Sequence, residues 1–310
     1  MKMKIERGEV CIFIPTLNEA PTIGDLVREF QDRGFEHILV MDGNSTDNTP
    51  DIARAAGAVV RTQTGKGKGN AIIEAVDVID RPYVLMLDGD GTYSPDDAEK
   101  MLEPLGRGFD HVIGDRLVNP EAGAFTRLNL LGNQLLNTMF RIAHGKDLSD
   151  ILSGYRAFSI QSIRQMTLKE AGFEIETEMA VEAVRNGQRI TVVPVRYLSR
   201  PGTVTKLDPF QDGVRIFSTI YRLAKMNNPI FYFGIIGLFM SLVGGITGVY
   251  VVYEWLQNIE HLPLTILTVL LITIGFQIFM FGVISDMLLA FHRETTRQIE
   301  QLQRPPEPPR

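Results

Sequence analysis

The hydrophobic residues of this chain follow one pattern up to residue 207 and a different one near the end. In the first part, short apolar runs alternate with stretches in which apolar positions recur at helical spacing. The runs of strand length are VCIFI, HILVMD, AVVRT and YVLMLD, and a polar or glycine-rich segment follows each. This alternation predicts an α/β domain over residues 1–207, with a mostly parallel sheet and its ligand at the carboxyl ends of the strands.

The C-terminal pattern is continuous rather than alternating. Residues Pro229–Leu256 and Leu262–Phe291 are almost entirely apolar, and each run exceeds the ~20 residues that a helix needs to cross a bilayer. Only a short linker separates them, so the sequence predicts an antiparallel hairpin of two transmembrane helices over residues 229–294. Residues 208–228 mix apolar and basic positions, which is typical of an amphipathic helix on the membrane surface. The proline-rich tail, 295–310, is predicted to be disordered.

Charges near the two apolar runs predict their orientation. Arg222 and Lys225 precede the first run, and Arg293 and Arg297 follow the second. By the positive-inside rule both flanks lie in the cytoplasm. The N-terminal segment MKMKIERGEV lacks the apolar core of a signal peptide. We therefore expect a two-span cell-membrane protein whose N-terminal domain and both termini are cytoplasmic.

Small residues in the first apolar run permit close helix contact. Gly244, Gly245 and Gly248 fall on neighbouring turns, a spacing that favours packing between membrane helices. Two interpretations stay open: a homo-oligomer formed through these helices, or packing within the hairpin itself.

Composition excludes some classes of partner. The net charge is −6, and no basic stripe with interleaved aromatic residues appears, so nucleic acid is not an expected partner. The single cysteine, Cys11, lies in an apolar run. It allows no internal disulfide and agrees with a reducing compartment.

The segment YVLMLDGD carries the strongest chemical signal. It runs an apolar strand into Asp88 and Asp90, two carboxylates one residue apart. Hard oxygen ligands of this kind suit Mg²⁺ or Mn²⁺, which usually completes its shell with water and substrate phosphate. The pair therefore predicts a nucleotide-diphosphate site with these aspartates as metal ligands. The turn Gly65–Asn70 resembles a phosphate cradle, although it lacks the P-loop pattern.

Five segments together resemble a known family. They are Pro15–Glu19, Asp42–Asp47, Asp88–Asp90, Ile113–Arg116 and Leu152–Arg156. In their order and spacing, the chain resembles the family-2 glycosyltransferases of the GT-A fold over residues 9–226. It is most similar to the dolichyl-phosphate mannose synthase-like group, and within it to archaeal polyprenyl-phosphate hexose synthases that begin N-glycan assembly.

The chain departs from that family at two positions. Gly43 stands where the family often has a second aspartate, and Thr92 stands where the mannose synthases often have a glutamine. The first departure affects the expected contacts to base and ribose. The second affects the expected outer ligand of the metal.

The resemblance implies a function. It implies metal-dependent, inverting transfer of a hexose from a nucleotide sugar to dolichyl or another polyprenyl phosphate, with UDP-glucose or a related UDP-hexose as the favoured donor. Membrane lipid is then a partner as well. The alternatives are a mannose synthase that uses GDP-mannose and a non-catalytic membrane scaffold with a degenerate transferase fold.

The resemblance also implies roles for individual residues. Nucleotide-sugar contacts fall on Pro15, Leu17, Glu19, Asp42 and Asp88, to which Lys66 or Lys68 adds. Asp90, Arg116, Arg200 and Lys206 are the expected catalytic residues, and the last three contact the acceptor phosphate. Arg127, placed just before a predicted helix, is a further expected phosphate contact.

Two other enzyme classes lack support. Polysaccharide-forming transferases carry a Q-x-x-R-W motif after the catalytic acid. The only tryptophan here is Trp255, in the first apolar run. A nucleotidyltransferase would show a G-x-G-T-R-x loop after the first strand, where PTLNE stands instead.

Overall fold

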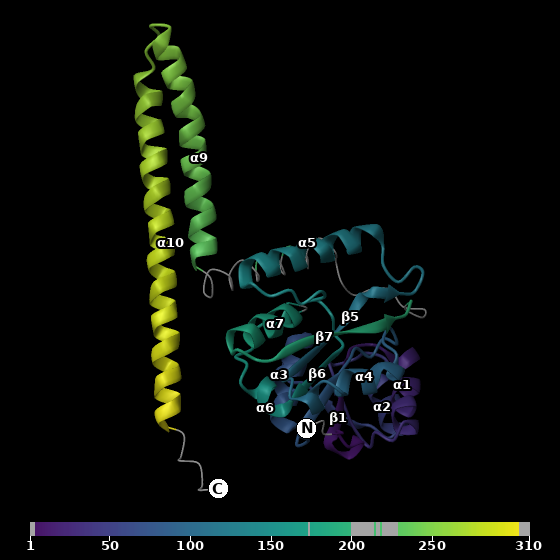
Figure 1. Ribbon diagram of the computed structural model, residues 1–310. Helices are drawn as coiled ribbons and strands as arrows, with labels where there is room; N and C mark the ends of the chain where they lie inside the picture. The colour runs from purple at the N-terminus through teal and green to yellow at the C-terminus, as the bar shows by residue number, and fades with distance from the viewer. Residues whose placement is uncertain (1–3, 173, 200–213, 215–217, 219–228, 304–310) are drawn as a thin grey trace. The chain divides into compact units, whose positions relative to one another are not determined.

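A computed structural model of the chain describes residues 4–172, 174–199, 214, 218 and 229–303. The chain divides into two compact units, residues 1–220 and 221–310. The first unit is an α/β domain and the second is a pair of long helices (Figure 1). The strands of the first unit are β1 (Val10–Thr16), β2 (His37–Asp42), β3 (Val59–Thr62), β4 (Tyr83–Met86), β5 (His111–Pro120), β6 (Arg156–Ser159) and β7 (Ile190–Tyr197).

These strands form one sheet in the order β3-β2-β1-β4-β6-β5-β7. All neighbouring pairs are parallel except those of β6, which runs antiparallel to both β4 and β5. The carboxyl ends of the parallel strands and the amino end of β6 therefore meet at one edge. This arrangement confirms the predicted α/β class with a mostly parallel sheet.

Helices cover both faces of the sheet. They are α1 (Ala20–Asp32), α2 (Thr49–Ala55), α3 (Lys68–Val78), α4 (Ala98–Leu102), α5 (Arg127–His144), α6 (Ile160–Arg164) and α7 (Ile175–Arg185), with short 3-10 turns η1 (Arg7–Glu9), η2 (Pro95–Asp97) and η3 (Leu105–Arg107). In β1, Val10, Ile12 and Ile14 pack in the hydrophobic layer of α1, α2 and α4, whereas Cys11 and Phe13 pack in the layer of α3, α6 and α7. Successive side chains of a strand point to opposite faces, so a continuous apolar run fits a sheet buried on both sides.

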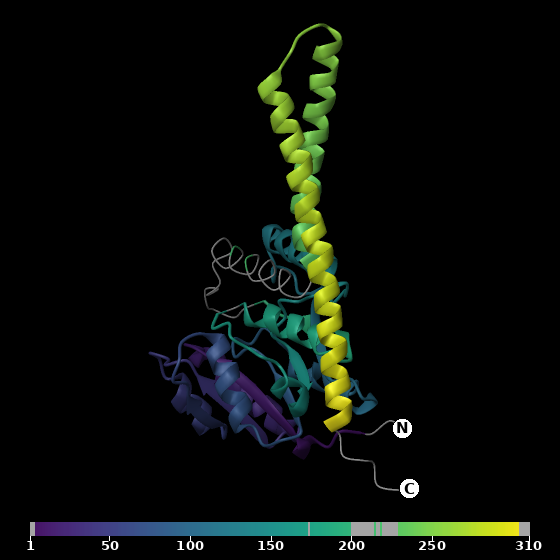
Figure 2. The same cartoon turned by 90° about the vertical axis from the view of Figure 1, so that its left-hand side faces the viewer.

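The second unit consists of α9 (Pro229–Leu256) and α10 (Leu262–Gln303), which run side by side in both views (Figure 1 and Figure 2). Their segments Ile230–Trp255 and Leu262–Phe291 are long and apolar enough to cross a membrane. Only 11% and 17% of their most apolar windows are buried. A core helix of a soluble protein would hide most of such a surface, so these exposed apolar helices indicate membrane association.

Glycines hold the two helices close together. A Cβ atom added at Gly237 would lie 2.5 Å from the carbonyl oxygen of Gly275, and one at Gly244 would lie 2.7 Å from the Ile272 side chain. Thr268 donates a hydrogen bond of 3.0 Å to Thr247 across the pair. Of the glycines in the predicted stripe, Gly244 and Gly248 therefore face α10 rather than another molecule. Packing within the hairpin accounts for them, and a homo-oligomer stays a prediction.

The end of α10 differs from the sequence-based expectation. The hairpin was expected to end at residue 294 and a disordered tail to follow over 295–310, but α10 continues to Gln303. Extending an existing helix needs no new nucleus, and the sequence after 290 contains no glycine or proline before Pro305. The predicted surface helix, 208–228, lies outside the described residues apart from 214 and 218.

Candidate functional site

The loops that follow β1 and β2 are joined into one unit at the edge of the sheet. The amide of Asn18 donates to Ser45 Oγ, and the amide of Thr46 donates back to Asn18 Oδ1, both at 2.8 Å. The amide of Glu19 donates to Thr49 Oγ1, also at 2.8 Å. Asn18 takes a left-handed conformation with φ of 52°, which asparagine tolerates better than most residues. The PTLNE and GNSTDNT segments are thus one structural element.

Asp42 ends β2 beneath this unit and is 3% exposed. Its Oδ2 accepts a hydrogen bond of 3.0 Å from the amide of Ser45, whereas Oδ1 has no hydrogen-bond partner. A buried acceptor without a donor is costly, so such an atom suits a donor group on a ligand. Of the neighbouring predicted contacts, Pro15 is buried and Leu17 is 43% exposed.

Gly43, the first departure from the family pattern, sits in a tight place. Its amide donates to the carbonyl of Thr16 at 2.7 Å. An added Cβ would lie 3.1 Å from that carbonyl oxygen and 3.5 Å from Leu17 Cβ. The β1 and β2 ends approach each other so closely that glycine fits best at this position.

The two aspartates of the D-x-D segment follow β4. Asp90 is 9% exposed, and its Oδ1 accepts hydrogen bonds from the amide and hydroxyl of Thr92 at 3.1 and 2.6 Å. Thr92, the second departure, therefore orients the Asp90 carboxylate. The carbonyl of Gly89, between the aspartates, accepts a 2.6 Å bond from Thr22. The last contact fixes the D-x-D segment against α1.

Asp88 forms an ion pair that joins three distant segments. Lys68, the first residue of α3, contacts Asp88 Oδ1 and also lies 2.5 Å from Glu176 Oε1 in α7. The Lys68 side chain is 11% exposed and that of Glu176 is 4% exposed. Burial alone would lower the pKa of the Lys68 ammonium, but the attraction of Asp88 and Glu176 raises it above its ordinary value.

The glycine-rich turn before α3 serves packing. A Cβ at Gly67 would lie 2.2 Å from the carbonyl oxygen of Ala171, and one at Gly69 would lie 1.8 Å from that of Glu170. The amide of Gly69 donates to Ala171 at 2.9 Å. These two glycines therefore let the loop before α7 approach the turn. Lys66 is exposed on this turn.

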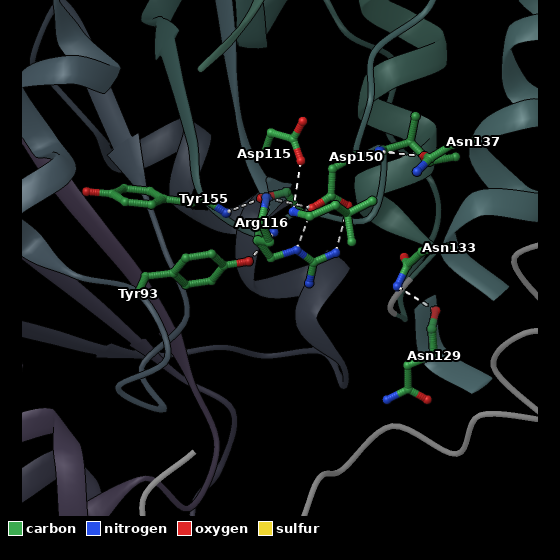
Figure 3. A network of polar contacts seen from close by, with 12 residues as sticks. Tyr93, Asp115, Arg116, Asn129, Asn133, Asn137, Asp150 and Tyr155 are labelled. Atoms are coloured by element: carbon green, nitrogen blue, oxygen red, sulfur yellow. Dashed lines mark hydrogen bonds and ion pairs between the residues drawn. The ribbon is translucent and has the colours of Figure 1, made fainter. Parts of the chain in front are cut away.

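Across the sheet, Arg116 extends from β5 into a bidentate pair with Asp150 (Figure 3). Its Nε and Nη2 donate to the two carboxylate oxygens at 2.7 and 2.8 Å. The guanidinium also lies over the rings of Phe125 and Tyr197, at 5.6 and 5.3 Å from their centroids. Arg116 is thus held rigidly, and Nη1 is left out of the carboxylate pair.

Tyr93 links the D-x-D segment to the loop before β6. Its hydroxyl accepts a 2.9 Å hydrogen bond from the amide of Gly154 (Figure 3). A Cβ at Gly154 would lie 2.5 Å from Asp88 Oδ2 and 2.9 Å from Lys68 Nζ. The loop backbone therefore presses against the Asp88 ion pair, and a side chain at 154 would displace it.

The same loop is anchored from below by Arg156, which is fully buried. Its Nε and Nη2 donate to the carbonyls of Ser153 and Ile151 at 2.9 and 2.7 Å, and Nη1 lies 3.3 Å from His111 Nε2. Burial lowers the pKa of Arg156 to about 10. Burial also lowers the pKa of His111 well below its ordinary value, with the charge of Arg156 adding to the effect.

Of the other predicted phosphate contacts, Arg127 is among the described residues. Arg127 is exposed at the first position of α5, which Thr126 caps by accepting a 3.1 Å bond from the amide of Asn129. Arg200 and Lys206 lie outside the described residues. The fold thus gathers Pro15, Leu17, Glu19, Asp42, Asp88 and Asp90 at the carboxyl ends of β1, β2 and β4. It places Arg116 within β5, just beyond the residues that pair with β6.

The carboxylates of Asp88 and Asp90 fit a hard divalent cation that takes its remaining ligands from other molecules. Both residues offer carboxylate oxygens at the site edge. Among the described residues, no group of three or more His, Cys, Asp and Glu side chains is arranged to hold a metal. Mg²⁺ or Mn²⁺ bound here would therefore take further ligands from water and a diphosphate.

Sequence reasoning missed two acidic partners in this network. Asp150 pairs with Arg116 from 34 residues away, and Glu176 pairs with Lys68 from a helix that also carries Glu178 and begins just after Glu174. One signal was available in the sequence: acidic residues stand at positions where a buried helix or loop usually has apolar side chains, and buried acids are usually paired.

Comparisons with known proteins agree with this geometry. Residues 11–167 match the family model described as glycosyl transferase family 2. The chain is 52% identical to glycosyltransferase AglJ of Haloferax volcanii, over 95% of this chain and 98% of that protein. It is 33% identical to a dolichyl-phosphate hexose transferase of the same organism, over 69% of this chain and 93% of that protein.

A solved structure shares the fold. Glucosyl-3-phosphoglycerate synthase from Mycobacterium tuberculosis, in complex with Mn²⁺ and UDP-glucose, superposes with a TM-score of 0.57 at 22% identity. The superposition covers 69% of this chain and 78% of that one. On its sequence match, its fold and the grouping of carboxylates at the strand ends, this chain is a glycosyltransferase that belongs to glycosyl transferase family 2.

Proposed function

We propose that this enzyme transfers a hexose from a nucleotide sugar to dolichyl or another polyprenyl phosphate, with inversion at the sugar. The observation that carries the proposal is the placement of Asp88 and Asp90 at the end of β4, beside the joined loops of β1 and β2, in a chain that also has two apolar helices. A nucleotide-sugar site and a membrane segment together suit a lipid acceptor.

The donor is UDP-glucose or a related UDP-hexose. Its nucleotide lies against Pro15, Leu17, Glu19, Asp42, Lys66 and Asp88. The buried Oδ1 of Asp42, which has no hydrogen-bond partner, supports this assignment because a base or ribose donor group would satisfy it. Asp90 and Asp88 would hold Mg²⁺ or Mn²⁺, whose charge would offset the negative charge on the leaving diphosphate.

The acceptor is a polyprenyl phosphate whose tail stays in the bilayer. The relative named dolichyl-phosphate hexose transferase supports this acceptor. Arg116, Arg127, Arg200 and Lys206 are the proposed phosphate contacts and, with Asp90, Arg116, Arg200 and Lys206 are the proposed catalytic residues. For Arg116 the contact falls to Nη1, since Nε and Nη2 hold Asp150.

The reaction needs no strong general base. A phosphate monoester has a second pKa of about 6 and is largely a dianion at pH 7, so its oxygen is already a nucleophile. The protein has to bring two anionic substrates together, which requires fixed positive charge near both. In-line attack opposite the leaving diphosphate converts an α-linked donor into a β-linked polyprenyl-phosphate hexose, an intermediate for glycan assembly such as protein N-glycosylation.

The proposed location follows from the same acceptor. The catalytic domain, residues 1–207, and both termini are cytoplasmic, where nucleotide sugars are made. Residues 208–228 lie on the membrane surface, and the hairpin over 229–294 spans the membrane twice. Glycosylation-site tagging at residues 257–261, which would be modified only on the outer side, tests this orientation.

Transfer of radiolabelled hexose to lipid tests the reaction. The purified full chain is incubated with dolichyl phosphate, Mg²⁺ or Mn²⁺, and a panel of UDP- and GDP-sugars. We expect one UDP-hexose to give a mild-acid-labile lipid that Asp90→Ala abolishes. Asp96→Ala is the matched control, because Asp96 is an exposed acid nearby that pairs with Arg33.

Each other outcome points to a stated alternative. Labelling from GDP-mannose alone would make the enzyme a mannose synthase. Metal-dependent nucleotide binding without a lipid product from any donor would favour a non-catalytic scaffold. An α-linked product, identified by the anomeric coupling in NMR spectra, would refute the inverting mechanism.

A further inference from the structure

Glu176 has no role in the function proposed above, yet it contacts Lys68, the ion-pair partner of Asp88 in the proposed donor site. We propose that Glu176 is a positioning residue that shares the Lys68 ammonium with Asp88, so that the fixed lysine neutralises only part of the charge of the D-x-D pair before metal or donor arrives. The inference rests on the proposed function, because it assigns the metal to Asp88 and Asp90.

The geometry places Lys68 between two carboxylates. Its Nζ contacts Asp88 Oδ1 on one side and lies 2.5 Å from Glu176 Oε1 on the other. The three residues come from the start of α3, the loop after β4 and the first turn of α7. Without Glu176, the Lys68 ammonium would lose its ion pair with α7 and would pair with Asp88 alone.

The burial of Glu176 argues against an incidental contact. The residue is 3% exposed, and its second oxygen, Oε2, is buried without a hydrogen-bond partner. Removing a carboxylate from water costs several kcal/mol, on the order of the attraction it regains. A single ion pair with one oxygen unsatisfied is a poor source of stability, so a role in the site explains this acid better.

The surrounding backbone fixes all three side chains. The glycines on either side of Lys68, Gly67 and Gly69, pack so closely on the loop before α7 that any added Cβ would overlap its carbonyl oxygens. Gly154 closes the other side, since its Cβ position lies 2.5 Å from Asp88 Oδ2. Lys68 therefore has little freedom to leave Asp88, and Glu176 has little freedom to leave Lys68.

The charges have a consequence for metal binding. Lys68 offsets the attraction of Asp88 for a cation, and Glu176 in turn offsets part of Lys68. The cluster of Asp88, Glu176 and Lys68 carries two carboxylates and one ammonium. A metal ion thus meets a site of moderate rather than full negative charge and binds firmly only when the donor's diphosphate adds its own oxygens.

Direct Mn²⁺ binding to the full chain, measured by electron paramagnetic resonance with and without UDP, tests this. Without UDP, we expect Lys68→Met to tighten Mn²⁺ binding and Glu176→Gln to weaken it, each by about tenfold, since removing one unit charge nearby changes a Coulomb energy by more than 1 kcal/mol at an effective dielectric of about 20. A merely structural role for the cluster would weaken binding in both variants.

A double variant guards against misfolding. Lys68→Met combined with Glu176→Gln removes one charge of each sign, so Mn²⁺ affinity should return to within about threefold of the unmodified protein. Glu174→Gln, two residues away on the chain, is the matched control and should shift nothing. Equal or like-signed shifts in the two single variants would overturn the inference.

Asp90→Ala separates this inference from the proposed function. If Asp90→Ala leaves Mn²⁺ binding unchanged, the metal site itself is misplaced and the proposed function fails with it. If Asp90→Ala abolishes binding while Lys68→Met and Glu176→Gln leave it unchanged, the metal site stands and the positioning role of Glu176 is wrong.

Discussion

Two charged regions lie at the edge of the sheet that carries the site, and they differ in how completely their polar atoms are hydrogen-bonded. The carboxylate edge, formed by Asp42, Asp88, Glu176 and Lys68, keeps acceptor atoms without hydrogen-bond partners, namely Asp42 Oδ1 and Glu176 Oε2. The arginine edge is formed by Arg116, Asp150 and Arg156. There the guanidinium groups are bonded to a carboxylate or to backbone carbonyls.

The two regions therefore differ in role. One contains buried acceptors that a ligand would satisfy, and the other holds a loop in place. Buried acceptors that lack donors are costly unless a ligand supplies the donors. The carboxylate edge is therefore suited to bind a ligand that donates hydrogen bonds. Matched buried charges fix the loop in which they lie, and of the Arg116 guanidinium nitrogens in the arginine edge only Nη1 stays outside the carboxylate pair. The arginine edge therefore holds the loop before β6 in place, and that loop in turn confines Asp88.

Breaking the arginine edge should have the largest effect. Asp150→Ala leaves Arg116 buried without its carboxylate, and we expect it to lower the free energy of unfolding by about 3–5 kcal/mol. Asp25→Ala is the control, because Asp25 pairs with Arg28 at the surface and should cost no more than about 1 kcal/mol. Thermal unfolding of the detergent-purified chain measures both. Equal losses would mean that Arg116 does not depend on its pair.

A clash introduced at the start of α3 tests how the carboxylate edge is packed. Gly69→Ala puts a methyl group 1.8 Å from the carbonyl oxygen of Glu170, and we expect a loss of about 1–3 kcal/mol together with weaker donor binding. Gly132→Ala in α5 has nothing within 4 Å. It should be neutral or stabilising by up to about 1 kcal/mol. Unfolding and UDP-binding titrations of both variants decide whether the turn is packed as described.

Acid should weaken the region beneath the arginine edge. Burial lowers the pKa of His144 to about 4 and lowers that of His111 well below 6.5, so both are neutral when folded. Below pH 6.5 the unfolded chain binds more protons, and stability falls with decreasing pH. The slope should be at most about 1.4 kcal/mol per pH unit per histidine between pH 6.5 and 4.

A variant identifies the contribution of one histidine to this slope. His144→Gln removes one titrating group, and denaturant unfolding at several pH values should show a shallower decline than in the unmodified chain. An unchanged slope would show that His144 is not held neutral in the folded protein.

The smallest effect is expected where the two edges meet. Tyr93→Phe removes the acceptor for the buried amide of Gly154, which should cost about 1 kcal/mol. Tyr83→Phe, at the opposite end of β4, should cost less. Hydrogen–deuterium exchange at residues 153–155 measures the effect locally, and unchanged exchange there would show that Tyr93 does not link the edges.

The sequence predicted the aspartates at the strand ends better than the ion-pair partners of Lys68 and Arg116. Asp42, Asp88 and Asp90 each end or closely follow an apolar strand, so a parallel sheet brings them to one side without further information. The partners of Lys68 and Arg116 cannot be inferred in this way. Glu176 lies more than a hundred residues from Lys68 in the chain, and only the packing of α3 against the loop before α7 makes them neighbours.

The glycine-rich turn shows the limit of motif reasoning. Gly65–Asn70 has the composition of a phosphate loop, but what requires glycine at positions 67 and 69 is the backbone of Glu170 and Ala171, more than a hundred residues along the chain. Local sequence reports that a position must be small or strained. It does not report which neighbour, ligand or protein, imposes the requirement.

The place of β6 has a consequence for the order of folding. β4 and β5 are not neighbours, because Arg156–Ser159 lies between them and pairs with both. As the chain leaves the ribosome, β1 to β4 can assemble at once, but β5 has no place in the sheet until β6 has emerged. The four residues of β6 are therefore what joins the β1–β4 side of the sheet to the β5–β7 side.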